Sequence, residues 1–182
     1  HRWVHVGEAG YGVALLTDVT YGHDVSRQTR DGGGAATTVR LSLVRAPHSP
    51  DPHADQGAHR FTYALLPGAT IGDAIAEGYA LNLPVRSAPV PDATPIVAVD
   101  HPGVVVEAVK LADDRSGDVV VRLYEALGGR AEAVVSTAFP LRSAEVVDLL
   151  ERPLSGLDPT GDSVRIRLRP FQILTLRLAG PK

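Results

Sequence analysis

The residues best suited to chemistry lie in one polar segment, 48–59, whose sequence is HSPDPHADQGAH. Its three His and two Asp carry the imidazole nitrogens and carboxylate oxygens that bind metal ions in proteins. Their spacing matches no closed zinc pattern, and the two Pro and one Gly among them are typical of a structured loop. We therefore expect a folded polar loop here, with a metal site as the less favoured alternative.

A second polar stretch, YGHD, places His23 and Asp24 together in a predicted tight turn. These two titratable groups are candidates for contacts with another domain or a ligand, although a capped hairpin is the simpler interpretation.

The sequence gives little support for other types of catalytic site. The absence of Cys excludes a thiol nucleophile, and there is no GxSxG motif. The GG pairs do not follow the glycine patterns of nucleotide-binding loops.

The elements that must position these residues are predicted to be β-strands, because apolar and polar residues alternate with a period of two. The clearest case is VRIRLR, in which Val164, Ile166 and Leu168 share one face. Similar alternation recurs along the chain, in the segments 3–6, 13–16, 39–45, 60–66, 104–109, 119–124, 131–135, 144–150 and 173–178. Gly and Pro separate these short strands at intervals typical of a sandwich. We predict an all-β protein of the β-sandwich class with at most one short helix.

Three segments interrupt the strand pattern. Residues 71–83 have the apolar spacing of a helix, and two Gly within them predict that it is short or irregular. Residues 28–37 contain three consecutive Gly and predict a hairpin tip. Residues 86–95 contain three Pro among small residues, which predicts an extended linker. We place a domain boundary in that linker, giving domains of 1–90 and 91–182.

Composition narrows the classes of partner. The chain has 182 residues, 44% of them hydrophobic, and a formal charge of −3, which favours neither nucleic acid nor an acidic membrane surface as a partner. No apolar run approaches the roughly 18–20 residues of a membrane span. A sequence without Cys fits the cytoplasm, with secretion left open. Because the sequence opens inside a predicted hairpin without an initiator Met, we interpret it as the C-terminal piece of a larger protein.

Five stretches carry a resemblance that extends over most of the chain in order: HRWV, YGVALLTDVTYGHDV, RLSLVRAPHSPDPHADQGAHRFTYALLPG, VVVEAVKLADDRSGDVVVRLYEALGGRAEAVV and PFQILTLRL. Together they resemble the C-terminal β region of glycoside hydrolase family 38 α-mannosidases. Only the glycine-rich insertion at 32–34 and the Pro-rich linker differ noticeably from the family's pattern. The resemblance implies that 1–90 is the tail of a large supersandwich and that 91–182 is a small terminal β-sandwich.

The same resemblance implies retaining hydrolysis of terminal α-mannosides, with a divalent cation, usually zinc, beside an Asp nucleophile. In the family these groups lie in an N-terminal catalytic domain, and none of the motifs that carry them can be matched to this sequence. We therefore expect a non-catalytic β fragment without a cofactor of its own. It would scaffold the catalytic domain of the same polypeptide and meet α-mannosides through that domain.

The carboxylates of the chain agree with this expectation. Retaining hydrolysis needs two facing carboxyl groups about 5 Å apart. The 21 Asp and Glu include no obvious pair on one face of adjacent strands. Asp113 and Asp114 have the sequence context of a solvated turn, and we interpret Glu107 and Glu125 as surface carboxylates or partners of an Arg. No catalytic and no metal-binding residue is predicted.

Polar residues of the first domain are candidates for a supporting role. We predict that they hydrogen-bond the catalytic domain or a distal sugar at the rim of its pocket. The primary candidates are Arg45, His48, Asp51 and His59, and the second group is His23 and Asp24.

An independent carbohydrate-binding module is the alternative function, because sugars stack on exposed aromatic rings. The nine aromatic residues mostly alternate with inward-facing apolar neighbours, as Phe61 and Tyr63 do, so we expect core or interface positions for them. A β domain that lacks partner strands exposes edges and apolar surface. We therefore also expect the isolated chain to form a homodimer.

Overall fold

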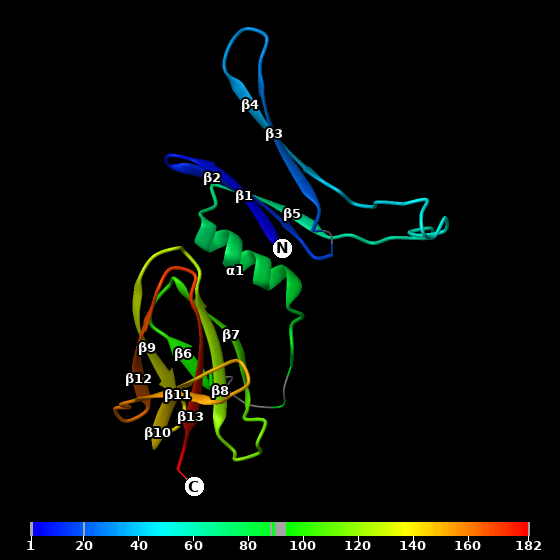
Figure 1. Cartoon of the computed structure of the whole chain (residues 1–182). Helices are drawn as coiled ribbons and strands as arrows, with labels where there is room; N and C mark the ends of the chain where they lie inside the picture. The colour runs from blue at the N-terminus through cyan, green and yellow to red at the C-terminus, as the bar shows by residue number, and fades with distance from the viewer. Residues whose placement is uncertain (1, 20, 88, 90–93, 182) are drawn as a thin grey trace. The chain divides into compact units, whose positions relative to one another are not determined.

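The structure is a computed structural model that describes residues 2–19, 21–87, 89 and 94–181 (Figure 1). The chain divides into two compact units, His1–Arg86 and Ser87–Lys182. Within the described ranges the chain is built from antiparallel strands and a single helix, which confirms the predicted all-β class. The domain boundary expected between 90 and 91, and much of the expected linker, lie outside the described residues, so that boundary stays a prediction.

The first unit is built on a three-stranded antiparallel sheet in the order β1-β2-β5. Its strands are β1 (Trp3–Glu8), β2 (Tyr11–Thr17) and β5 (Tyr63–Pro67). One face of the sheet packs against α1 (Ile71–Asn82), which contacts β1 and β2. The buried residues of this core are small or few: Ala14, Leu16, Ala69 and Ala74, with Trp3, Ala64, Leu66 and Leu81 at their margin.

Helix α1 is regular over its 12 residues. It begins with a capping box, in which the Asp73 N–H donates to Thr70 Oγ1 at 3.1 Å and the Thr70 N–H donates to Asp73 Oδ2 at 2.8 Å. Gly78 is buried, and a Cβ at this position would lie 3.0 Å from Trp3 Cδ1. This glycine therefore allows the helix to pack closely on β1, so it serves packing and does not mark an irregularity.

A two-stranded hairpin extends from the first unit (Figure 1). It consists of β3 (His23–Thr29) and β4 (Ala35–Leu41), joined by a turn at 30–34 that contains the three Gly. The hairpin tip predicted at 28–37 is therefore shorter than expected, because the strands extend into it from both sides. The two strands pair only with each other among the described residues, and most of their side chains are exposed. A lone hairpin is marginally stable in water, so these strands depend on what packs against them.

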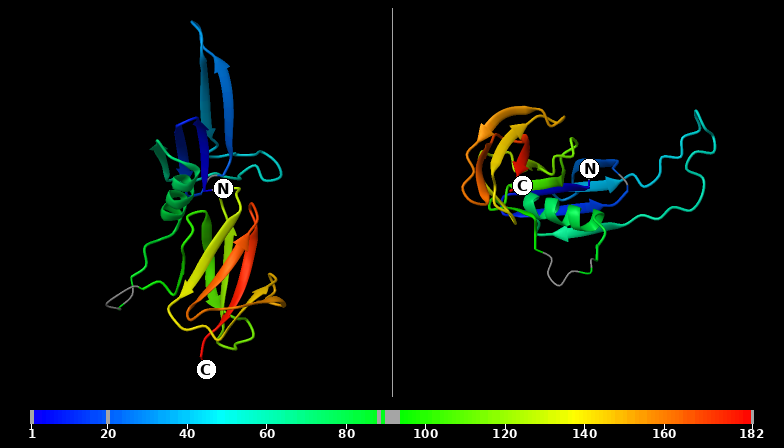
Figure 2. Two further views of the ribbon diagram at one scale, coloured as in Figure 1. Left: turned by 90° about the vertical axis from the view of Figure 1, so that its left-hand side faces the viewer. Right: turned by 90° about the horizontal axis from the view of Figure 1, so that it is seen from below.

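The second unit is a β-sandwich of two antiparallel sheets (Figures 1 and 2). The larger sheet has the order β11-β10-β13-β8-β7, and the smaller has the order β12-β9-β6. The strands are β6 (Val97–Val99), β7 (Val104–Leu111), β8 (Val119–Glu125), β9 (Ala131–Thr137), β10 (Ser143–Val147), β11 (Pro153–Leu157), β12 (Ser163–Leu168) and β13 (Ile173–Ala179).

The core of the sandwich lies between its two sheets. Every second residue of β12 is buried, as the alternation of VRIRLR predicts. These side chains face fully buried residues of the larger sheet, among them Leu123, Leu176 and Leu178. The second unit therefore has an apolar interior of its own. No helix in the described part of the chain is long and apolar enough to cross a membrane.

We expect Leu123→Ala to destabilise the second unit by about 3 kcal/mol, because it removes a fully buried side chain and leaves a cavity. Urea denaturation followed by circular dichroism measures the change. The matched control is Leu154→Ala at a position that is 66% exposed, and it should stay within about 0.5 kcal/mol of the wild type. Equal effects of the two substitutions would contradict the assigned core.

Candidate functional site

The polar segment predicted to be a folded loop is indeed held by internal hydrogen bonds. The Ala46 N–H donates to Asp55 Oδ2 at 3.0 Å and closes the loop on itself. Asp51 Oδ1 accepts from the His53 N–H at 2.8 Å, and His59 Nε2 donates to the Asp55 carbonyl at 2.7 Å. Asp51 and His59 are therefore occupied by their own loop.

The remaining residues of this loop do not converge on a site. Arg45 and His48 are exposed, and within the described ranges neither has a hydrogen bond or ion pair. The described residues also contain no group of three or more His, Asp or Glu that could hold a metal ion. The rim role predicted for these side chains depends on another domain, and it stays a prediction.

His23 and Asp24 do not form the predicted tight turn, because both belong to strand β3. Asp24 lies opposite Arg40 on β4, and Asp24 Oδ1 is 3.1 Å from Arg40 Nε. The turn prediction is wrong because the cross-strand pairing with β4 extends the backbone through both residues. Asp24 thus forms an ion pair within the hairpin, while His23 stands at its base.

His23 lines a hollow of about 210 Å³ at the base of the hairpin. The hollow is lined by apolar side chains and a few polar ones: Trp3, Val4, Leu15, Thr17, Tyr21, His23 and Leu41. No local sequence pattern predicts this hollow, because its lining comes from four separate segments of the first unit. The described residues that line it include no carboxylate, so these residues cannot supply the paired acids of glycoside hydrolysis.

The second unit contains two groups of neighbouring carboxylates, and each group is arranged around a basic side chain. Asp114 Oδ2 and Asp118 Oδ2 each lie 2.7 Å from the guanidinium of Arg177. Asp113 and Glu151 both bind Lys110. These pairs fix the loop after β7 to β13 and to the loop between β10 and β11, and each of the four acids has a cation as its partner.

Glu125 is buried, with 2% of its surface exposed, which corrects its interpretation as a surface carboxylate. It accepts hydrogen bonds from the N–H groups of Leu127 at 2.9 Å, Gly128 at 2.8 Å and Phe171 at 3.0 Å. Burial raises the pKa of Glu125, but these bonds and one from Gly129 outweigh it, so the pKa lies below its usual value. The carboxylate is therefore ionised and structural.

The fold defines a class of protein: an antiparallel β-sandwich preceded by a smaller unit of sheet and helix. Comparisons with protein families identify this region. Residues 103–176 match the glycosyl hydrolases family 38 C-terminal beta sandwich domain, and residues 1–53 match the glycosyl hydrolases family 38 C-terminal domain. The chain belongs to the C-terminal β region of glycoside hydrolase family 38, as the sequence predicted.

Individual relatives cover nearly all of the chain. It is 38% identical to alpha-mannosidase 2C1 from Homo sapiens, over 98% of the chain and 17% of that protein. It is 30% identical to an alpha-mannosidase from Saccharomyces cerevisiae, over 98% of the chain and 18% of that protein. The crystal structure of an alpha-mannosidase from Enterococcus faecalis shares the fold, with a TM-score of 0.64 and 17% identity over 98% of this chain and 21% of that one.

We expect Glu125→Gln to lower the unfolding midpoint of the second unit. The amide keeps the shape of the side chain, but it loses the negative charge and sets donors against backbone N–H groups. Urea denaturation at pH 7 measures the change. The control is Glu132→Gln, where the side chain is 72% exposed and no shift of the midpoint is expected. A midpoint unchanged in both variants would contradict the structural role of Glu125.

The pH dependence of stability should include a contribution from Asp114. Hydrogen bonds from Ser116 and Arg177 lower the pKa of Asp114 from 3.8 to about 2. Because the folded pKa lies below the unfolded one, this contribution is complete above about pH 4 and is lost as the pH falls toward 2. The free energy of unfolding, measured by urea denaturation at several pH values between 7 and 2, should therefore decrease less steeply with falling pH for Asp114→Asn than for the wild type. Parallel curves would contradict the assignment.

Proposed function

We propose that the chain acts as the C-terminal β region of a larger α-mannosidase, in which it supports the catalytic domain of the same polypeptide. The family assignment supports this proposal, because the matched relatives named above are alpha-mannosidases. The chain spans 17% to 18% of the length of these two relatives. In the proposed enzyme the remaining sequence supplies the hydrolytic residues.

The observation that carries the scaffold role is the face of the β1-β2-β5 sheet opposite α1, which is only partly covered. The strand register places Val4, Leu15 and Leu65 in one row across the three strands. This row lies on the face opposite α1. Val4 and Leu15 are half-buried at the hollow by the hairpin base, whereas Leu65 is 65% exposed. Removing such a row from water stabilises an interface at roughly 25 cal/mol per Å². The small core of the first unit makes this additional burial important.

Unpaired strands support the same proposal. Strand β1 is an edge of its sheet, and the β3–β4 hairpin has no third strand in the described part of the chain. Further strands of the large sandwich would complete both. Arg45 and His48 would then face the catalytic domain, where they are proposed to contact it or a distal sugar.

The chemistry itself would lie in the catalytic domain. We propose that this domain holds the Asp nucleophile and a divalent cation, usually zinc, for retaining hydrolysis of terminal α-mannosides. The chain would contribute to that reaction by positioning the domain and its pocket rim. A cytoplasmic location and self-association of the isolated chain through its open edges are parts of the same proposal.

A carbohydrate-binding module is the second candidate function, and the exposure of Tyr63 favours it. The core position expected as one alternative for Tyr63 is wrong: 62% of its surface is exposed, because Ala64 and Leu66 face α1 instead. The interface position stays a prediction. Calorimetry with mannose and mannobiose separates the two functions. Binding that is abolished by Tyr63→Ala would favour the module, whereas absence of binding would favour the scaffold.

We expect Leu65→Asp in the full-length enzyme to reduce hydrolysis of an aryl α-mannoside at least severalfold, because it places a charge in the proposed interface. The same substitution in the 182-residue chain should leave its stability unchanged, since Leu65 is exposed there. Leu83→Asp is the matched control at a position that is 56% exposed and outside the sheet. Activity assays and urea denaturation provide the two measurements.

Two results would overturn the scaffold proposal. The first is full activity of the Leu65→Asp enzyme. The second is hydrolysis of the aryl α-mannoside by the isolated chain, assayed with and without zinc.

A further inference from the structure

The sandwich of the second unit is closed on one side and open on the other. Strand β6 contacts β7, so the two sheets meet along that side. At the other end of the smaller sheet, β12 is an edge strand, while β10 and β11 extend the larger sheet. A pocket of about 520 Å³ lies here, and residues of β10, β11 and β12 all line it. The smaller sheet therefore has room for a further strand beside β12.

The backbone of β12 is arranged to receive that strand. The Thr137 N–H donates to the Asp162 carbonyl at 2.9 Å, which fixes the alternation of hydrogen bonds between β9 and β12. It follows that Val164 and Ile166 bond to β9, while the N–H and C=O groups of Arg165 and Arg167 point to the free edge.

Both ends of this edge are closed by turns. Ser163 exchanges backbone hydrogen bonds with Thr160, and the Arg169 N–H donates to Gln172 Oε1 at 2.9 Å. Only the central groups, at Arg165 and Arg167, lack backbone partners in the described part of the chain. The edge is thus a short, bounded segment.

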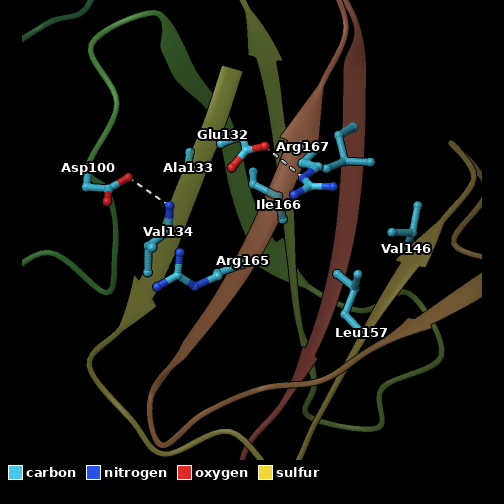
Figure 3. A pocket seen from close by; sticks show the side chains of 10 residues that line it. Asp100, Glu132, Ala133, Val134, Val146, Leu157, Arg165, Ile166 and Arg167 are labelled. Atoms are coloured by element: carbon cyan, nitrogen blue, oxygen red, sulfur yellow. Dashed lines mark hydrogen bonds and ion pairs between the residues drawn. The ribbon is translucent and has the colours of Figure 1, made fainter. Parts of the chain in front are cut away.

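The side chains beside this edge divide by face (Figure 3). Val146 and Leu157 of the larger sheet line the pocket together with Ile166 and Leu174, so the inner side is apolar. The guanidinium of Arg165 lies on the outer side, and no carboxylate within the described ranges forms an ion pair with it.

The pocket lining contains two acids on its outer side, Asp100 and Glu132, and each has a partner in the chain. Asp100 accepts a hydrogen bond from the Val134 N–H at 2.7 Å. Arg167 Nε lies 3.0 Å from Glu132 Oε1, but both side chains are more than 70% exposed, and such a surface pair exchanges readily. The outer side therefore presents the positive charge of Arg165, and Arg167 can exchange its partner Glu132 for another carboxylate.

We propose that the free edge of β12 binds an extended acidic segment of another protein by strand addition. Residues of the added strand opposite Arg165 and Arg167 would be Asp or Glu, and the residues between them would place apolar side chains in the pocket. A second copy of the chain is a poor occupant, because pairing β12 with β12 would bring arginines together. This inference does not depend on the proposed mannosidase role.

The test uses the 182-residue chain and two acetylated, amidated heptapeptides, one of alternating Glu and Val and the other of alternating Lys and Val. At low ionic strength the acidic peptide should bind and shift the backbone amide signals of Arg165 and Arg167 in ¹H–¹⁵N spectra. It should also slow hydrogen exchange at these two amides. Binding should weaken as salt is added.

Three variants of one exposed residue separate charge from backbone pairing. Arg165→Glu should weaken binding of the acidic peptide by about tenfold through charge repulsion. Arg165→Pro removes the N–H that faces the free edge without affecting the ladder to β9, and it should weaken binding more than Arg165→Gln, which loses only the charge. Equal binding of the two peptides, absence of binding, or shifts confined to other strands would overturn the proposal.

Discussion

The second unit depends on one buried carboxylate. Glu125 ends β8, and its oxygens accept hydrogen bonds from the loop that follows and from Phe171, in the turn before β13. Strands β8 and β13 are neighbours in the middle of the larger sheet. By tying their connections together, Glu125 fixes the end of the sheet whose residues form most of the core. Burial of this charge is tolerable because backbone donors surround it.

The two units differ in how completely they bury their own apolar side chains. The second encloses large side chains such as Leu123 and Leu176 between two sheets. The first covers one face of its sheet with α1 and leaves Leu65, on the other face, largely exposed. This contrast fits a region in which the sandwich holds its own shape while the preceding unit forms an interface. The family assignment and the proposed support of a catalytic domain fit the same division.

The candidate sites show why residue type alone is a limited guide to chemistry. The segment richest in His and Asp forms a loop whose polar groups, such as Asp51 and His59, largely bond to one another. The paired carboxylates of the second unit enclose Arg177 and Lys110. In each case the position of a partner, and not the identity of the acid, decides its role. Acidic and His side chains whose partners lie within the chain stabilise its fold.

The sequence by itself determined the all-β class, the helix, most of the strands and the family, because period-two alternation, helical spacing and motif order are local properties of the chain. It also predicted the folded loop of residues 48–59. It did not predict strands β3, β6 and β11. Only the tertiary structure decided that Glu125 is buried, since its partner Phe171 is 46 positions away. The same holds for Asp114 and Arg177, which are 63 positions apart, and for the open edge at Arg165. Partners so distant in sequence meet only after the sheets have packed, and no local pattern encodes which residues will face each other.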